Sequence, residues 1–317
     1  MFKKHFQTVF RWAGYAAFTI FVFLASLFFV FPYHELSEYL VAKARQADIH
    51  LRIDSLKPSF LGIEAKGIQL GPVFSKPGLA MAIGKFQVDS LSIRPNPLLL
   101  KLTTNIKIAN GHIQFSTGIL NQQNFAAEAK GVDLSQMNFP ALLWLLSPET
   151  YSSESVPPKL EMEGVLSHAQ MSFYIPKEQS ASEANGNWNI EVDNLTLKQG
   201  TIVMPWPGSA ESIPVDLPRV VLGNLKTSAS IKKGQVQIVQ TKTQSDELTC
   251  ELLGNIQLAK RLAYSEANLT LRLQVQPEFL GRLGMLGPAV SLLPVDPQDG
   301  QWRKAQLSGQ LSRLKMK

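Results

Sequence analysis

The chain of 317 residues has a hydrophobic content of 45% and a formal net charge of +6, so its composition is that of a packed protein and excludes extensive disorder. Three of its 31 basic residues precede the first long apolar segment, which leaves 28 basic residues against 25 acidic residues in the remainder. This balance is too weak to indicate nucleic-acid binding, which requires a clustered basic face, and we predict no nucleic-acid partner. The single cysteine, Cys250, excludes an intramolecular disulfide, and its alternating apolar surroundings predict a buried thiol.

Residues 12–33 form an uncharged segment dominated by Phe, Leu, Val and Ala. As a helix the segment would span roughly 33 Å, enough to cross a hydrocarbon core of about 30 Å. Its length and its bulky C-terminal end favour an uncleaved anchor over a signal peptide, which has a shorter apolar region followed by small residues. The residues that predict the topology are Lys3, Lys4 and Arg11 in the cytoplasmic N-terminus (1–11), and Trp12 and Tyr33 at the two membrane interfaces.

A short amphipathic helix is predicted over residues 34–47, directly after the anchor. Leu36, Tyr39, Leu40 and Lys43 recur at helical spacing, and the opposite side is polar. Because that polar side mixes both charges, we expect the helix to cap the following domain and not to lie on lipid.

From Asp48 onward the hydrophobic period changes from 3.6 to 2, which predicts strands with one apolar face and one polar face. Turn signals at 109–111, 198–200 and 232–234 are expected to separate such strands. We therefore predict a mainly β fold, an elongated and curved antiparallel sheet with a few short helices. The clearest alternating segments are 49–53, 188–192, 227–231, 235–238 and 269–275.

Two short patterns recur along the chain. Residues 64–70 (EAKGIQL) return as 128–134 (EAKGVDL), and an apolar-x-Gly-x-apolar motif occurs at 162–166, 252–256 and 307–311. A glycine at the inward-facing position of a strand permits a bend or the close approach of another backbone, so the motif predicts curvature. Chance likeness between short β motifs is the alternative to a true repeat.

Helices are predicted at two further places. Residues 139–146 have Pro140 in the first turn of a short apolar helix, and residues 278–293 show helical spacing that several glycines weaken. The polar, proline-containing stretch 148–159 is the predicted connection between a first β region (48–147) and a second β region (160–317).

Catalytic and metal-binding motifs are missing from the sequence. The five histidines are scattered without ligand spacing, and the nucleophile-elbow, phosphate-loop and dinucleotide motifs do not occur. We predict a protein that is not an enzyme, with no cofactor and no metal.

The layout resembles protein N of the type II secretion system (the GspN family), in the form found in delta-proteobacteria. The residues that carry the resemblance are Phe31-Pro32-Tyr33-x-x-Leu36, Ala65-Lys66-Gly67-Ile68-x-Leu70, Gly300-x-Trp302 and Leu307-Ser308-Gly309-x-Leu311. This family is similar in turn to AsmA-type inner-membrane proteins, whose curved sheets present an apolar groove to lipid. The resemblance implies a single-pass protein of the bacterial inner membrane with a cytoplasmic N-terminus and a periplasmic C-terminal domain.

Two functions follow as expectations. The first is a non-enzymatic component of the type II secretion inner-membrane platform, with other secretion components as its partners. The alternative is an AsmA-like protein that binds or transfers lipid along an apolar groove. If the apolar strand face is covered by a helix or a second sheet, its residues are ordinary core; if it is open, it needs a ligand or partner. The candidate groove residues are Ile190, Val192, Leu271, Leu273 and Val275.

Overall fold

The fold was analysed in a computed structural model. The structure describes residues 15, 18–19, 22–23, 26, 30–59, 62–73, 83–96, 100–118, 124–146, 159–176, 181–205, 212–260, 264–284, 286–311 and 315–316. Four predicted topology residues (Lys3, Lys4, Arg11 and Trp12) and most of the predicted anchor 12–33 lie outside these ranges. Within these ranges, no helix has the length and apolar character needed to cross a membrane.

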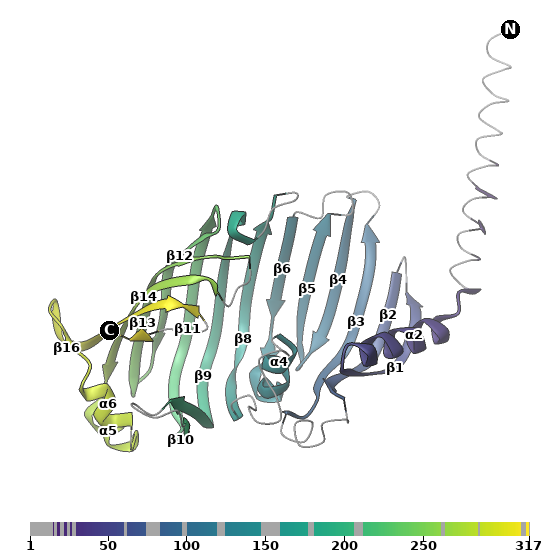
Figure 1. The fold of residues 1–317 in the computed structure, drawn as a ribbon. Helices are drawn as coiled ribbons and strands as arrows, with labels where there is room; N and C mark the ends of the chain where they lie inside the picture. The colour runs from purple at the N-terminus through teal and green to yellow at the C-terminus, as the bar shows by residue number, and fades with distance from the viewer. Residues whose placement is uncertain are drawn as a thin grey trace, which may run out of the picture.

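The described strands form one large antiparallel sheet, which confirms the prediction of a mainly β fold. Most strands pair with the next long strand in the chain, so the sheet is a meander (Figure 1). The long strands are β1 (Ile49–Ser59), β2 (Gly62–Pro72), β3 (Phe86–Asn96), β4 (Lys101–Ile108), β5 (Gly111–Gly118), β6 (Asn124–Lys130), β8 (Lys159–Tyr174), β9 (Asn185–Pro205), β11 (Val220–Lys232), β12 (Gln235–Gln244), β13 (Leu248–Gln257), β14 (Glu266–Val275) and β16 (Asp299–Gln310). The short strands are β7 (Val132–Asp133), β10 (Ser212–Leu217), β15 (Val295–Asp296) and β17 (Lys315–Met316).

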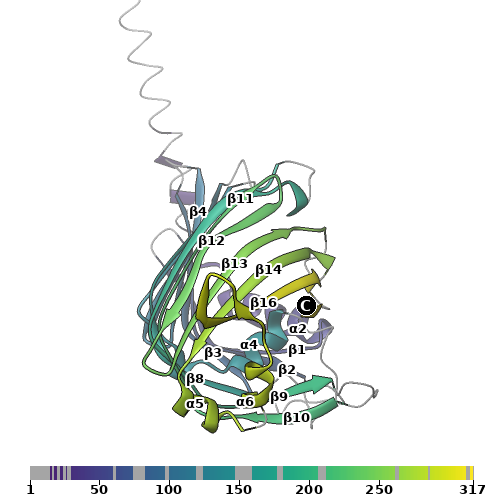
Figure 2. The same cartoon turned by 90° about the vertical axis from the view of Figure 1, so that its left-hand side faces the viewer.

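The sheet is bent across its width, so that one of its faces is concave. Figure 2 looks along the sheet and shows β13, β14 and β16 curling back over the side on which α4 (Phe139–Leu146) lies. The predicted connection 148–159 falls outside the described ranges except for Lys159. The residues on either side of it belong to one sheet, because β6 pairs with β8.

Two of the three predicted turns are tight hairpin turns. Ala109 and Asn110 join β4 to β5 with φ of 48° and 62°, and Lys233 and Gly234 join β11 to β12 with φ of 48° and 70°. Two consecutive positive φ values give the turn whose twist matches the flanking strands. The predicted turn at 198–200 is wrong. β9 runs straight through it, because pairing with β8 and β10 on its two sides supplies partners for its backbone.

The glycines of the apolar-x-Gly-x-apolar motif allow another backbone to approach closely, as predicted. Gly164, Gly254 and Gly309 have φ of 134°, 134° and 118°, which side chains other than glycine rarely adopt. A Cβ at Gly254 would lie 2.3 Å from the carbonyl oxygen of Asn268 on β14. The glycine of the EAKG motif has a similar backbone conformation both times, since Gly67 and Gly131 have φ of 62° and 67°. Gly67 lies within β2, whereas Gly131 lies between β6 and β7.

α4 forms over the predicted residues, and Asn138 fixes its start. The Asn138 Oδ1 accepts a hydrogen bond from the Ala141 N–H (3.0 Å), and its Nδ2 donates to the Ile83 carbonyl (3.0 Å). The predicted helix at 278–293 is divided into α5 (Pro277–Arg282) and α6 (Leu286–Ser291), because Gly284 between them adopts a left-handed φ of 55°.

α2 (Tyr33–Gln46) packs beside β1, the strand that it precedes. The prediction of which face of this helix packs against the domain was partly wrong, because Tyr39 and Leu40 remain 58% and 38% exposed. The side chains that are half-buried include the smaller residues Ser37, Val41 and Ala44. A two-residue turn brings the chain from α2 directly into β1, and small side chains allow the helix to approach the strand closely.

Candidate functional site

One face of the sheet carries an uninterrupted row of uncharged residues. The row follows the register of neighbouring strands and crosses thirteen of them, from β1 to β16. We call these residues the apolar row. They are Pro58, Ile63, Ile93, Thr104, Phe115, Ala127, Met171, Trp188, Ala229, Ile238, Gly254, Leu269 and Leu307.

The adjacent row, one residue further along each strand, points to the opposite face and is polar. Because side chains alternate between the faces of a sheet, the two rows divide the sheet into an apolar face and a polar face. The polar row from β1 to β11 consists of Lys57, Glu64, Ser92, Asn105, Gln114, Glu128, Gln170, Asn189 and Ser228.

The apolar face is the concave face. Ala65, Leu91, Ile106 and Ile113 alternate in step with the apolar row, and they pack in one cluster with Met137, which lies just before α4. Figure 2 places α4 on the inner side of the bend. The side chains of this cluster therefore point into the curve.

The concave face is covered in some places and exposed in others. Near α4 and β7 it forms ordinary core, since Val132 and Trp144 are 1% and 4% exposed. Toward the other end of the strands, Ile93, Phe115 and Phe125 are 37%, 44% and 42% exposed. Within the described chain, β5 and β6 contact mainly their neighbouring strands, and no second sheet packs over them.

A hollow of about 600 Å³ lies where β5, β6 and β8 reach this exposed end. Its lining includes Phe125 and Phe173, which are register partners on the apolar face, and Tyr174 and Lys101 at the strand ends. Pockets of about 300 to 1,000 Å³ lined mainly by apolar side chains are typical of small-molecule sites.

The predicted groove residues lie on this apolar face, in two groups. Ile190 and Val192 are on β9, whereas Leu271, Leu273 and Val275 are on β14, with β11, β12 and β13 between them. Val192 is buried at 6% exposure, and the other four are half-buried. The groove residues therefore belong to the less accessible part of the face.

The more exposed residues Phe115 and Phe125 were missed by the sequence prediction. The alternation of Ile113, Phe115 and Thr117 was the available signal, and their greater exposure follows from their place toward one end of the sheet. Nothing in the local sequence distinguishes that end from the covered one.

Cys250 also lies on the apolar face, as the register partner of Leu273 and Thr243. Burial, and secondarily the charge of Glu251, raises the pKa of the Cys250 thiol to about 11. The thiol is protonated at neutral pH and is a poor nucleophile. Cys250 is half-buried and not fully buried as predicted.

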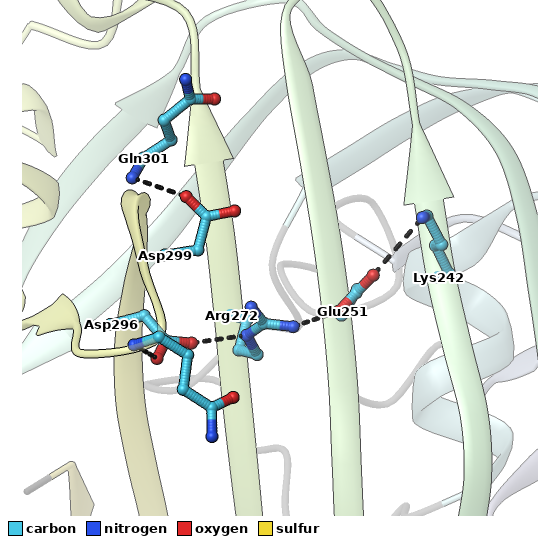
Figure 3. Close-up of polar contacts among 7 residues, drawn as sticks. Lys242, Glu251, Arg272, Asp296, Asp299 and Gln301 are labelled. Carbon is cyan, nitrogen blue, oxygen red and sulfur yellow. Dashed lines mark hydrogen bonds and ion pairs between the residues drawn. The ribbon is translucent and has the colours of Figure 1, made fainter.

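On the polar face, a chain of ion pairs joins four strands at the C-terminal end of the sheet (Figure 3). Arg272 on β14 donates to Glu251 on β13 (2.9 Å) and to Asp296 on β15 (2.8 Å), and Glu251 also pairs with Lys242 on β12 (3.4 Å). The guanidinium stacks on the Trp302 ring at 4.6 Å. These contacts hold the segment after α6 against the sheet.

The pKa of Asp296 is lowered from its ordinary value of 3.8, first by the hydrogen bond from the Gln298 N–H and then by Arg272. A lowered carboxyl pKa contributes stability above pH 3.8, and this contribution is lost as the pH falls through the folded-state pKa. The ion-pair chain should therefore stabilise the protein at neutral pH and fail in acid.

Arg272→Met is expected to lower the melting temperature at pH 7 by about 5 to 10 °C, because it leaves the buried Asp296 carboxylate without its partner. The difference from the unmodified protein should shrink as the pH falls below 3.8 and through the lowered folded-state pKa of Asp296, because the carboxylate then becomes protonated. Arg52→Met is the matched control: Arg52 pairs with Asp54 at an exposed site, so its loss should change the melting temperature by about 1 °C or less. Equal melting temperatures for the two variants across the pH range would show that the ion pairs of Arg272 do not stabilise the protein.

The fold and the site define a class of protein, a large antiparallel sheet with a row of uncharged residues on one face and a polar row on the other. Within the described residues, no group of His, Cys, Asp and Glu side chains is arranged to hold a metal ion. Comparison of the chain with protein-family models, curated proteins and solved structures found no significant match.

Proposed function

We propose that the protein binds the acyl chains of lipids along the concave apolar face of its sheet, with the elongated, curved architecture of AsmA-type proteins. The observation that carries the proposal is the apolar row, which crosses thirteen strands without a charge. Its members Ile93 and Phe115 are partly exposed, as is Phe125 on the same face, whereas Ala229, Ile238 and Leu269 are buried. The exposed part of this face is unfavourable in water, and a ligand or partner that covers it would be stabilising. An alkyl chain is long, thin and uncharged, and it matches such a row.

The proposed location is the bacterial inner membrane, with the sheet on the periplasmic side. The uncharged segment 12–33 and the basic residues before it support this location. The binding face would then lie next to a source of lipid.

The second candidate is the non-enzymatic role in the type II secretion platform. It is favoured by the Phe31-Pro32-Tyr33 and Leu307-Ser308-Gly309 motifs, which lie at the start of α2 and in β16. A role of this kind would use protein contacts, for which the polar face and the strand ends are available.

The two candidates are distinguished by a photo-crosslinking amino acid placed at Phe115 or at Gln114. These neighbours lie on the same strand and point to opposite faces. We expect Phe115 to capture lipid in cells, and Gln114 to capture at least about tenfold less, because only Phe115 borders the bound acyl chain. Capture of a protein at Gln114, without lipid at Phe115, would favour the secretion platform and contradict lipid binding.

A further inference from the structure

A cation lies on the apolar face at its β16 edge. Arg303 on β16 is the register partner of Leu273, so its side chain starts on the apolar face, whereas Lys304 pairs with Arg272 of the polar face. Arg303 ends a second row of register partners on this face, and the other described members of that row are uncharged. The row, from β8 to β14, consists of Leu166, Val192, Leu225, Thr243, Cys250 and Leu273.

Arg303 differs from the other arginines near this end of the sheet. Arg272 pairs with two carboxylates and Arg282 pairs with Glu247. The half-buried Arg303 donates from Nη1 to the backbone carbonyl of Leu293 at 3.2 Å, and no described carboxylate lies within 4.0 Å of it. A neutral carbonyl leaves the positive charge uncompensated in apolar surroundings, which is unfavourable unless an anion is present.

The surroundings of Arg303 are those of a boundary between apolar and polar regions. Its second register partner, Val295, is 47% exposed, and Leu292 nearby is 84% exposed. The acyl-binding face therefore ends in a cation flanked by exposed apolar side chains. An amphiphile with a negative head group has the complementary arrangement.

We propose that Arg303 binds the phosphate of a phospholipid with a net negative head group, whose acyl chains extend from β16 over the apolar face. This proposal rests on the lipid-binding function proposed above and specifies the ligand. The planar guanidinium offers two parallel donors to a phosphate. Adjacent rows on β13 and β14, such as Leu252–Leu271 and Cys250–Leu273, lie about 7 Å apart, so the face has room for two chains side by side.

The test uses the purified full chain, mixed with vesicles of equal parts phosphatidylglycerol and phosphatidylethanolamine, with oleate as a third competitor. The lipids that copurify are quantified by mass spectrometry. We expect the unmodified protein to retain phosphatidylglycerol about tenfold more than phosphatidylethanolamine. Both lipids carry the phosphate, but the ammonium group of phosphatidylethanolamine competes with Arg303 for it. Arg303→Gln should reduce this ratio to about one while total bound lipid is preserved, and Lys304→Gln, which removes a neighbouring charge from the polar face, should leave the ratio unchanged.

A phosphatidylglycerol preference that survives in Arg303→Gln, or a preference for oleate in the unmodified protein, overturns the proposal without affecting lipid binding as such. Failure of the unmodified protein to retain any of the three lipids rejects the proposed function itself. If Arg303→Gln does not fold, Arg303→Lys replaces it. Lys keeps the charge but lacks the two parallel donors of the guanidinium, so the ratio of phosphatidylglycerol to phosphatidylethanolamine should fall between one and the value of the unmodified protein. An unchanged ratio contradicts bidentate binding.

Discussion

Phe115→Asp is expected to reduce lipid binding about a hundredfold. Phe115 lies within the apolar row and is 44% exposed, so the new carboxylate would be covered by the bound acyl chain. Placing a charged side chain in a hydrocarbon environment costs about 2.5 to 3.5 kcal/mol, which corresponds to roughly two orders of magnitude in affinity. Because Phe115 is only partly buried, the substitution should cost much less folding stability than a charge in the core.

The matched control is Gln114→Asp, which adds the same charge one residue away on the polar face. It should bind lipid as the unmodified protein does, and both variants should be compared by lipid copurification and by thermal unfolding. Equal lipid retention by folded Phe115→Asp and Gln114→Asp would show that acyl chains do not lie over the apolar row. A loss of lipid binding in both variants would point to a general electrostatic effect. It would also contradict the binding of acyl chains over the apolar row.

Gly254→Ala is expected to lower the free energy of unfolding by about 3 kcal/mol. Gly254 has a φ of 134°, and a Cβ would lie 2.3 Å from the Asn268 carbonyl oxygen and 2.8 Å from the Leu269 Cα. Both neighbours are backbone atoms of the paired strand, which cannot move without breaking the ladder between β13 and β14. Alanine would therefore add backbone strain and a steric clash at the same position.

Gly300→Ala is the control, since a Cβ there would meet nothing within 4 Å. Denaturant unfolding should show a change of about 0.5 kcal/mol or less for this variant. If Gly254→Ala were as stable as Gly300→Ala, the close approach of β13 and β14 at this glycine would be wrong. Gly164 has the same φ on β8, so an Ala there should also be destabilising.

Local patterns in the sequence were sufficient for the secondary structure. Alternation predicts strands in segments such as 269–275 because each strand has one apolar and one polar face. The compact apolar run 139–146 with an early proline predicts α4, and the Asn-Gly and Lys-Gly dipeptides predict the two hairpin turns. The turn predicted at 198–200 failed because pairing on both sides of β9 outweighs the local preference of Gly200.

The candidate site could be predicted only in part. Alternation places Ile190, Val192, Leu271, Leu273 and Val275 on one side of their strands, and the register of the sheet puts that side on the apolar face. It cannot tell which part of the face is exposed, because exposure depends on where α4 and β7 pack. Phe115 and Val192 have similar local patterns, yet they are 44% and 6% exposed.

The sequence alone determines that this chain has strands with two contrasting faces, since a period of two is a local property of the backbone. It also determines the glycine positions at which those strands can bend. The joining of thirteen strands into one continuous apolar row, and the place of Arg303 at the end of a second row on the same face, depend on the register between strands. Register is a relation between residues far apart in the chain, and a shift of one residue would have exchanged the two faces.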